Sequence, residues 1–501
     1  MKIVLISPYA NAFSFGTRTL SSCLKKYGHN VKVIFLCRNF WERYDDQILA
    51  AMVELSRGAD LIGISLMTNF FDNAVQITQR LKRDLDIPIL WGGIHPTIRP
   101  QECLDYADLV CLGEGEEALI ELVKKMEEKQ DYRHIPGIWA KDKNSIITNK
   151  IRPLIQDLDS IPFPDYYDYE NHYILDGKCI QKMSEALLNK YSLGHYMTMP
   201  TRGCPFGCSY CCNNTINKMH LYQKIVRKRS VDNVIKELLH AKDSWPGMLS
   251  VYFDDDAFFL YTPEELREFG NKYKKNIGLP LGIGGITPST LTREKLSLLV
   301  DAGLKSTRMG IQSASESTKK LYRRNYPNQL VLAAARIINE FKDKIDTPQY
   351  DILIGNPWEK DEDLIKTLIF LTKLPRPYYF STYLLTLYPE TELYEKAKKE
   401  GIIADDLRDV YRKHYNRYKK TYLNKLFLLL NASLGNISTT TMSLLTNKTL
   451  RRLRLNWLLY WVLALRYCRP LGLLSEGLKD MKKGDFFRII RWFRKLNPVL
   501  K

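Results

Sequence analysis

The first 130 residues alternate between short apolar runs and longer stretches in which apolar residues recur at helical spacing. Such strands, buried on both faces and separated by crossover helices, predict a doubly wound (Rossmann-like) parallel sheet. Ligands of such sheets bind beyond the carboxyl ends of the strands. The predicted strands are Ile3–Ser7, Val31–Leu36, Leu61–Leu66, Ile87–Trp91 and Leu109–Leu112, and the predicted helices include Thr17–Tyr27, Asn73–Leu85 and Glu116–Lys129.

A second alternating series extends from about Tyr196 to Ile403. Six strand–helix units predict an open, partial (β/α)6 barrel of the TIM type, with function at the carboxyl ends of its strands. The predicted strands are Tyr196–Thr201, Leu249–Phe253, Leu281–Gly284, Ser306–Ile311, Gln349–Leu353 and Phe380–Leu387. The predicted helices include Val231–Lys242, Pro263–Tyr273, Arg293–Ala302, Gln329–Phe341 and Asp361–Leu371.

The pattern divides the α/β chain into four parts. Residues 1–135 form the first domain, and residues 136–192, rich in Asp, Tyr, Pro and Asn, predict a surface connector. Residues 193–403 form the barrel, and residues 404–501 form a basic, helical C-terminal region. The net charge is +18, and residues 401–501 hold 21 basic and 6 acidic residues, or +15. Acidic partners are therefore expected at the tail.

Composition favours a globular protein in a reducing compartment. The hydrophobic content of 45% is that of a protein with a real core. Six of the ten cysteines are scattered, which argues against a disulfide framework, and four are clustered between residues 204 and 212. The apolar run at the N-terminus is only four residues long, too short for a signal peptide, so we expect a cytoplasmic protein.

The clustered cysteines carry the decisive motif, C-x-x-x-C-x-x-C, with Cys204, Cys208 and Cys211 after the first strand of the second series. Three thiolates can hold three irons of a 4Fe–4S cubane and leave the fourth iron open, as a catalytic cluster requires. The alternative is a zinc knuckle with Cys212 or His220 as fourth ligand. Adjacent Cys211 and Cys212 would both bind one tetrahedral ion only with strain.

This motif resembles that of the radical S-adenosylmethionine (SAM) superfamily. The resemblance implies that the amino and carboxylate groups of SAM chelate the open iron. An electron from the cluster, supplied by a reductant of the flavodoxin or ferredoxin type, then cleaves SAM to a 5′-deoxyadenosyl radical. Beyond the cluster cysteines, no catalytic residue is assigned.

Further positions resemble the SAM contacts of this superfamily. Tyr210 stands where an aromatic residue usually lies near adenine, and Phe253–Asp256 stands where the SAM amino group is bound. The alternative for the second segment is a solvated acidic turn. Glu390 replaces a usual glycine after the sixth strand, which leaves that turn uncertain. The predicted SAM-binding residues are Tyr210, Asp254, Asp255, Gln312, Ser313, Glu316, Ile354 and Leu387.

Gly92–Thr97 and Gly113–Glu116 resemble the class that carries a cobalamin (B12)-binding domain, which includes class B methyltransferases and the anaerobic Mg-protoporphyrin ester cyclase. Paired glycines let the backbone approach a ligand closely, and the second segment opens a helix that could face a polar tail. The predicted cobalamin contacts are Ser65, Met67, Thr68, Gly92, Gly93, His95, Gly113, Glu114 and Gly115.

No D-x-H-x-x-G sequence offers a histidine to cobalt. The resemblance therefore implies that the dimethylbenzimidazole tail is displaced without a histidine replacing it, and that Met67–Phe70 lies near the lower face of the corrin. His95 is expected to be structural or to contact the tail; the alternative is a cobalt ligand.

The tail contains two apolar segments. Trp457–Leu465 spans about 14 Å as a helix, too short to cross a bilayer. Phe486–Leu496 separates apolar and basic faces, and the region 451–496 therefore predicts peripheral contact with an anionic membrane surface, at the inner membrane face. The alternative is a helical domain that buries Trp457, Trp461 and Trp492. Nucleic acid ranks lower because no RNA-binding motif accompanies the charge.

The resemblance implies a cobalamin-dependent radical SAM methyltransferase that acts on an unactivated carbon. A membrane-seated tail favours a hydrophobic small molecule, such as an isoprenoid lipid or a tetrapyrrole. The alternatives are a radical cyclase, oxidase or carbon–carbon coupling enzyme without methyl transfer, a tRNA-modifying enzyme, and a non-enzymatic cobalamin or redox sensor.

Overall fold

The computed structural model describes residues 1–143 and 145–467, which fall into two units. The first unit comprises Met1–Met309, Leu321–Arg324 and Leu385–Tyr415. The second comprises Gly310–Lys320, Asn325–Leu384 and the described residues from Asn416 to Tyr467.

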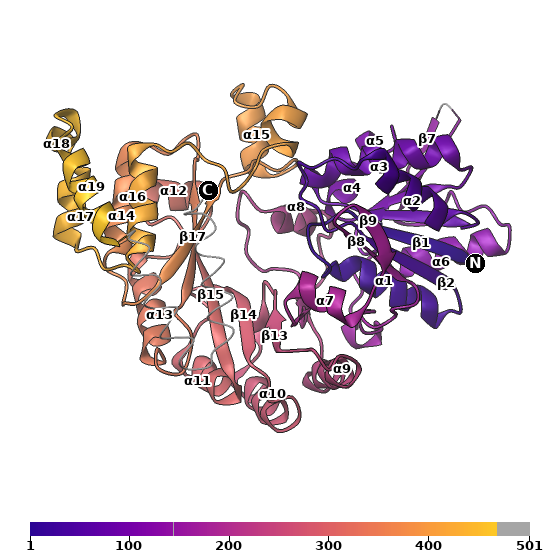
Figure 1. Ribbon diagram of the computed structural model, residues 1–501, viewed down its shortest axis with the longest axis horizontal. Helices are drawn as coiled ribbons and strands as arrows, with labels where there is room; N and C mark the ends of the chain where they lie inside the picture. The colour runs from indigo at the N-terminus through magenta and orange to yellow at the C-terminus, as the bar shows by residue number, and fades with distance from the viewer. Residues whose placement is uncertain (144, 468–501) are drawn as a thin grey trace. The chain divides into compact units, whose positions relative to one another are not determined.

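A nine-stranded sheet forms the N-terminal part of the first unit, in the order β7-β6-β5-β4-β3-β1-β2-β8-β9. Its core is parallel, with Val4 opposite Lys32 on one side and Ile3 opposite Leu61 on the other. Figure 1 shows helices on both faces of this sheet, which confirms the predicted doubly wound fold. The central strands are β1 (Lys2–Ser7), β2 (Asn30–Phe35), β3 (Leu61–Ser65), β4 (Ile89–Gly92) and β5 (Leu109–Cys111), and the helices are α1 (Phe15–Lys26), α2 (Asp46–Ser56), α3 (Phe71–Asp84), α4 (Ile94–Ile98), α5 (Pro100–Cys103) and α6 (Gly115–Glu127).

The segment expected as a surface connector differs from that expectation, because it extends the first sheet at both edges. Its strands pair antiparallel at three of the four new junctions, and β8 lies parallel to β2. Edge strands expose one face or both, so their hydrophobic pattern is weak. Strand β9 is exposed at three of its four positions. The added elements are β6 (Ile138–Asp142), β7 (Ser145–Ile147), β8 (His172–Asp176), β9 (Cys179–Lys182) and α7 (Glu185–Ser192).

The second sheet has six strands in chain order, β10-β13-β14-β15-β16-β17, and β15 continues from the first unit into the second. Sequential order with intervening helices confirms the predicted partial barrel (Figure 1). The strands are β10 (His195–Thr198), β13 (Ser250–Phe253), β14 (Leu281–Ile286), β15 (Leu304–Gln312), β16 (Gln349–Ile354) and β17 (Tyr379–Leu384). The helices are α8 (Cys212–Met219), α9 (Val231–Ser244), α10 (Pro263–Asn276), α11 (Arg293–Ala302), α12 (Glu316–Leu321), α13 (Asn328–Glu340) and α14 (Asp361–Leu371), and β11 (Thr201–Arg202) pairs with β12 (Arg227–Lys228) as a separate ribbon.

The C-terminal region is helical as far as it is described. Within residues 1–143 and 145–467, no helix combines the length and apolarity that crossing a bilayer requires. The amphipathic segment predicted at Phe486–Leu496 lies outside the described residues. The last elements are α15 (Glu392–Lys399), a π-helical turn (Leu407–Tyr411), α16 (Tyr422–Ala432), α17 (Thr439–Thr446), α18 (Lys448–Arg452) and α19 (Leu455–Tyr467).

Candidate active site

The cysteine loop lies between β11 and α8 in the first unit. Gly203 precedes it with φ of +87°, and a Cβ there would lie 2.2 Å from the carbonyl oxygen of Ile225. Only glycine fits this turn without displacing the backbone. The chain thereby enters the loop at Cys204, followed by the buried Cys208 and the half-buried Cys211.

Hydrogen bonds fix this loop from several sides. The amide of Cys211 donates to the carbonyl of Cys208 (3.1 Å), and Asn217 Nδ2 donates to the carbonyl of Cys204 (2.9 Å). Ser209 Oγ donates to the carbonyl of Leu321 (2.6 Å). Arg324 Nη1 donates a hydrogen bond to Cys208 Sγ (3.7 Å).

The loop supplies donors for a cubane rather than for a single ion. Among the described residues, no three His, Cys, Asp or Glu side chains converge as a single metal ion requires. A cubane does not need such convergence, because each thiolate binds a different iron. Burial raises the pKa of Cys204 to about 12, so binding must replace its proton by iron. Three thiols on one braced loop, one of them beside a guanidinium, fit the cluster.

Four of the predicted SAM residues belong to the first unit: Tyr210, Asp254, Asp255 and Leu387. Tyr210 packs edge-to-face on Tyr322, with ring centroids 5.0 Å apart. Asp254 is exposed, whereas Asp255 is buried and accepts hydrogen bonds from the amide and hydroxyl of Thr201, both at 2.6 Å. Burial raises the pKa of Asp255 to about 6. Its carboxyl group therefore braces the loop, and its contact with SAM stays a prediction, as does that of the buried Leu387.

The remaining predicted SAM residues belong to the second unit. Gln312 has φ of +67°, and its buried Oε1 has no hydrogen-bond partner among the described residues. Ser313 Oγ lies 3.1 Å from Thr367 Oγ1, and Ile354 is fully buried. Glu316 is exposed and pairs with Lys319 at 2.7 Å.

Two polar residues beyond β16 were missed by sequence reasoning. Asn356 Nδ2 and Glu359 Oε2 are buried and, like Gln312 Oε1, lack a hydrogen-bond partner within the described chain. Glu359 Oε1 accepts a hydrogen bond from Thr318 Oγ1 (3.1 Å). Their position just after a barrel strand was the available signal.

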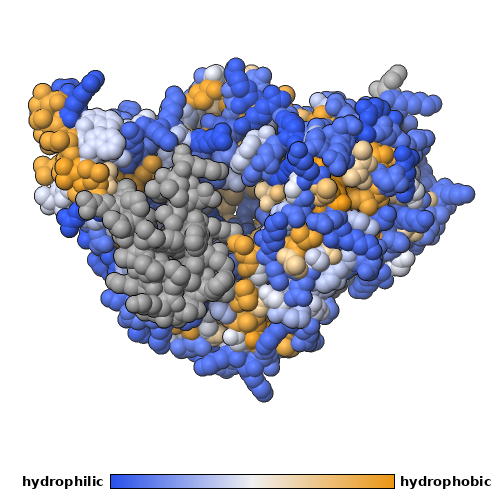
Figure 2. Space-filling model, viewed as in Figure 1, coloured by the Kyte–Doolittle hydropathy of each residue, from blue (hydrophilic) through white to orange (hydrophobic). Residues whose placement is uncertain are grey.

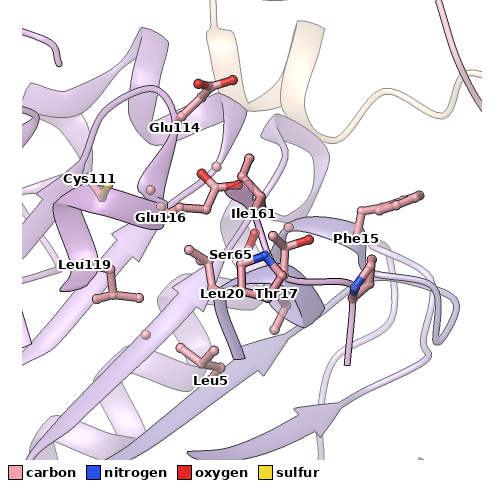
Figure 3. A pocket seen from close by; sticks show the side chains of 18 of the residues that line it. Leu5, Phe15, Thr17, Leu20, Ser65, Cys111, Glu114, Glu116, Leu119 and Ile161 are labelled. Carbon is pink, nitrogen blue, oxygen red and sulfur yellow. The ribbon is translucent and has the colours of Figure 1, made fainter. Parts of the chain in front are cut away.

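A cavity of about 340 Å³ opens at the carboxyl ends of the central strands of the first sheet. Its walls are mainly apolar, and Figure 3 shows Leu5, Leu20 and Leu119 around it with Ser65 among them. Ser65 Oγ lies 3.2 Å from Tyr9 Oη. The predicted cobalamin contacts that line this cavity are Ser65, Gly92, Gly93, Gly113, Glu114 and Gly115.

The glycines shape this cavity by leaving room. A Cβ on Gly115 would lie 3.4 Å from Leu20 and 3.6 Å from Cys111. Gly93 has φ of +103°, and a Cβ there would lie 2.8 Å from the carbonyl oxygen of Leu66. A mainly apolar slot with a few hydroxyl groups in its wall, Ser65 among them, fits the flat benzimidazole tail of cobalamin.

The three other predicted cobalamin contacts lie elsewhere. Met67 and Thr68 line a second cavity, whereas His95 is fully buried and lines neither. His95 Nδ1 lies 3.2 Å from Thr68 Oγ1, and burial lowers the pKa of His95 to about 3. The imidazole packs against Phe71 and Tyr411, with centroids 5.1 Å away in each case. These contacts describe a neutral histidine that supports the loop after β3.

The second cavity also measures about 340 Å³ and lies within the first unit. None of the described residues that line it carries a charged side chain. Cys212 at one wall follows Cys211, a predicted cluster ligand, and Met67 at another belongs to the predicted cobalamin loop. The other lining residues are Ala10, Asn39, Phe40, Trp41, Thr68, Asn69, Phe70, Ile94, Ile98, Tyr388 and Tyr415.

Ion pairs that the sequence did not reveal connect the start of α6 with the β11–β12 ribbon beside the cysteines. Glu114 accepts hydrogen bonds from Arg227 Nη1 at 2.8 and 2.9 Å, and Glu116 accepts one from Arg202 Nη2 at 2.6 Å. Arg227 is only 4% exposed. These ion pairs hold Gly113–Glu116, the segment predicted to face the cobalamin tail, against the β11–β12 ribbon, and β11 leads directly into the cysteine loop.

Comparison with known proteins assigns both domains. The family model of the B12 binding domain matches residues 1–123, and that of the radical SAM superfamily matches residues 198–371. An uncharacterized methyltransferase of Pyrococcus horikoshii is 27% identical over 352 residues, which cover 69% of this chain and 70% of the relative. The anaerobic magnesium-protoporphyrin IX monomethyl ester cyclase of Rubrivivax gelatinosus is 23% identical, over 80% and 72%.

Among solved structures, the fold is similar to that of the radical SAM methyltransferase TsrM from Kitasatospora setae with cobalamin and a 4Fe–4S cluster bound. The TM-score is 0.63 at 19% identity, over 80% of this chain and 78% of that chain. The two family models confirm the expected cofactors: cobalamin, SAM and the 4Fe–4S cluster. The chain belongs to the radical SAM superfamily and is an enzyme that carries a B12 binding domain ahead of its radical SAM domain.

Proposed function

We propose that this enzyme is a cobalamin-dependent methyltransferase that acts on an unactivated carbon of a hydrophobic small molecule. The second cavity carries the proposal, because it joins the cluster loop at Cys212 to the predicted cobalamin loop at Met67. Transferring an unpaired charge into such a cavity would cost several kcal/mol, so its uncharged walls favour an apolar substrate. The names of the similar proteins from Pyrococcus and Kitasatospora support methyl transfer.

At the cluster loop, Cys204, Cys208 and Cys211 would hold the iron. When bound, the cluster supplies an open iron for SAM and the electron that cleaves it. The chain positions this chemistry through Gly203, which lets the loop turn, and through Arg324, which lies beside Cys208. The proposed SAM contacts stay as the sequence predicts them: Tyr210, Asp254, Asp255, Gln312, Ser313, Glu316, Ile354 and Leu387. A flavodoxin or ferredoxin would deliver the electron.

In the first domain, Ser65 and the glycines around it would hold the cobalamin tail, with Ser65 Oγ as one polar group of the slot. Cobalamin supplies a carrier for the methyl group. Thr68 and His95 would hold the loop after β3 in place, and their hydrogen bond does not depend on a charged imidazole. We propose that the enzyme works in the cytoplasm, at the inner membrane face.

The substrate class follows from the walls of the second cavity. Phe40, Trp41 and Tyr415 offer ring faces, and Phe40 and Tyr415 are stacked with centroids 6.3 Å apart. Such walls suit an isoprenoid chain or a flat macrocycle such as a tetrapyrrole. A second candidate function is radical cyclisation, oxidation or coupling without methyl transfer, favoured by the similarity to the cyclase over 80% of this chain.

The experiment uses anaerobically purified, reconstituted holoenzyme with SAM labelled in the methyl group and a strong reductant. A solvent extract of the host's lipids and pigments serves as the source of substrate. Label in an extractable product supports methyl transfer. Substrate-dependent 5′-deoxyadenosine without label in any product contradicts methyl transfer and supports the second candidate.

The cluster assignment has its own test. Cys208→Ala should lower bound iron severalfold and abolish reductive SAM cleavage, because one iron loses its thiolate. Cys212→Ala is the matched control and should keep both iron and cleavage. Iron and sulfide analysis with chromatography of 5′-deoxyadenosine measures both variants, and cleavage that persists in Cys208→Ala would refute the assignment.

A further inference from the structure

Helix α19 exposes an apolar face. Leu458 is 72% exposed and Leu465 is 65% exposed, and three further large apolar side chains of the helix are at least half exposed. The sequence offsets of these residues are 0, 3, 6, 7 and 10, which a 3.6-residue repeat gathers on one side of a helix. Figure 2 shows hydrophobic residues in the region of α17–α19, at the upper left. The residues of this face are Leu455, Leu458, Trp461, Val462 and Leu465.

The opposite side of α19 is anchored in the second unit. Trp457 and Tyr460 pack against Tyr422 of α16, with centroids 5.2 and 6.2 Å away. Asn456 is buried, and its Nδ2 lies 3.5 Å from the carbonyl oxygen of Leu445. The helix is therefore held by one side, and its apolar face points to solvent because of that packing.

The charged residues of α19 and of the chain on either side of it all have one sign, and the exposed Asp361 of α14 is paired with Arg451. Arg452 and Arg454 are exposed just before α19, and Arg466 is exposed at its end. The 66 residues from Val410 to Ser475 contain no Asp or Glu, and they contain 12 Lys and Arg. An apolar stripe between exposed arginines complements a surface that is apolar inside and anionic outside.

We propose that α19 docks the enzyme on a bilayer that contains anionic phospholipids. The helix has 13 residues and is about 20 Å long, shorter than the roughly 30 Å of a hydrocarbon core, so it lies along the surface. Leu458, Trp461 and Leu465 enter the headgroup boundary, and the arginines contact phosphates. The surface works without any cofactor and independently of the reaction proposed above.

Charge repulsion disfavours two other occupants of this face, a second copy of the chain and the chain's own residues 468–501. A second copy docked face to face would bring Arg452, Arg454 and Arg466 toward an identical set. The chain from Cys468 to Lys501 holds nine basic and three acidic residues, so it would also be repelled by these arginines. A bilayer with phosphatidylglycerol has the opposite charge.

The test is co-sedimentation of the full chain with vesicles of phosphatidylcholine, alone or with about 30% phosphatidylglycerol. We expect binding to the anionic vesicles only, and weaker binding at high salt because the arginine contribution is screened. The double variant L458D/W461D should bind at least about tenfold more weakly, because it loses apolar burial and gains repulsion. L221D is the matched control, since Leu221 is also exposed (63%) but lies in the first unit, and it should bind like the parent.

Three results would overturn the proposal: no binding of the parent chain to anionic vesicles, equal binding of L458D/W461D, or equal loss in L221D. Sedimentation velocity without lipid separates the other occupants. A dimer that L458D/W461D dissociates would assign the face to a second copy. Vesicle binding that requires removal of residues 468–501 would assign it to that segment. Far-UV circular dichroism verifies that the variants are folded.

Discussion

A single buried carboxyl group gives the second unit a pH dependence. Burial raises the pKa of Glu359 to about 7 from its ordinary 4.5, and the nearby Asp363 adds repulsion. The folded state therefore holds this proton more tightly than the unfolded chain does, and stability contributed by the neutral form is lost as pH rises from about 4.5 through 7. We expect the unfolding free energy of the parent to fall by about 1–3 kcal/mol between pH 5 and 8 because of this group, and Glu359→Gln should not show this fall.

Urea unfolding of parent and variant at both pH values measures this difference. Glu362→Gln is the matched control, because Glu362 is exposed three residues further along, and it should keep the parent's pH dependence. If the difference in unfolding free energy between the parent and Glu359→Gln is the same at pH 5 and pH 8, the carboxyl group of Glu359 does not titrate as a buried group.

Among single residues, the sequence predicted those whose functional partners lie close to them in the chain. Cys204, Cys208 and Cys211 lie within eight positions, so their spacing predicts a metal-binding loop, and the resemblance to the radical SAM superfamily implies a cluster there. Glu359 and Arg227 escaped prediction because their partners come from other segments, Thr318 and Glu114. The environment of such a group is set by the fold and leaves no mark in the neighbouring sequence.

Among the elements, the β11–β12 ribbon depends on ion pairs for its attachment. Glu114→Gln removes the charge opposite Arg227, whose side chain is 4% exposed and would stay buried without its counter-ion. Carbonyl oxygens of Ile155 and Ile225 still accept hydrogen bonds from Arg227, so we expect a loss of about 2–4 kcal/mol. Thermal or urea unfolding measures it.

The control for this variant is an ion pair at the solvent-exposed surface of the protein. Arg267 and Glu294 lie 3.2 Å apart and are each about half exposed, so Glu294→Gln should cost less than about 1 kcal/mol. Equal losses in both variants would mean that the buried pair does not brace the ribbon.

Strands with two buried faces were predicted well, and edge strands were not. Central β1 and β3 are apolar at almost every position, which is the pattern that reveals them. In β9, one of four residues is half-buried and three are exposed, so its pairing with β8 rests on backbone hydrogen bonds that no side-chain pattern announces.

For the whole molecule, the cavity beneath the first domain's loops predicts ligand-linked stability. Hydroxocobalamin at about 100 times its dissociation constant should stabilise the chain by roughly 2.7 kcal/mol and raise the melting temperature by several degrees. Ser65→Leu should abolish this shift, because the added side chain fills the slot. Scanning calorimetry with and without the ligand measures it.

Ser145→Leu, on the exposed start of β7, is the control and should keep the shift of the parent. An unchanged shift in Ser65→Leu would place the tail of cobalamin elsewhere. The sequence indicated such a ligand through its glycines, but the size and walls of the cavity arise only when Leu5, Leu119 and Ile161 meet across the sheet.

Asn69 gives the second cavity a further property. Its side chain accepts from Tyr388 Oη (2.8 Å) and donates to the carbonyl oxygens of Tyr411 (2.9 Å) and Lys413 (3.4 Å). One amide thus holds two backbone carbonyl groups and the hydroxyl of Tyr388 in place, and widening the cavity there would break a buried hydrogen bond at a cost of about 1–3 kcal/mol. A substrate of the proposed site would therefore be selected by its thickness: molecules wider than the cavity would not fit, whereas narrower ones would enter without displacing Asn69.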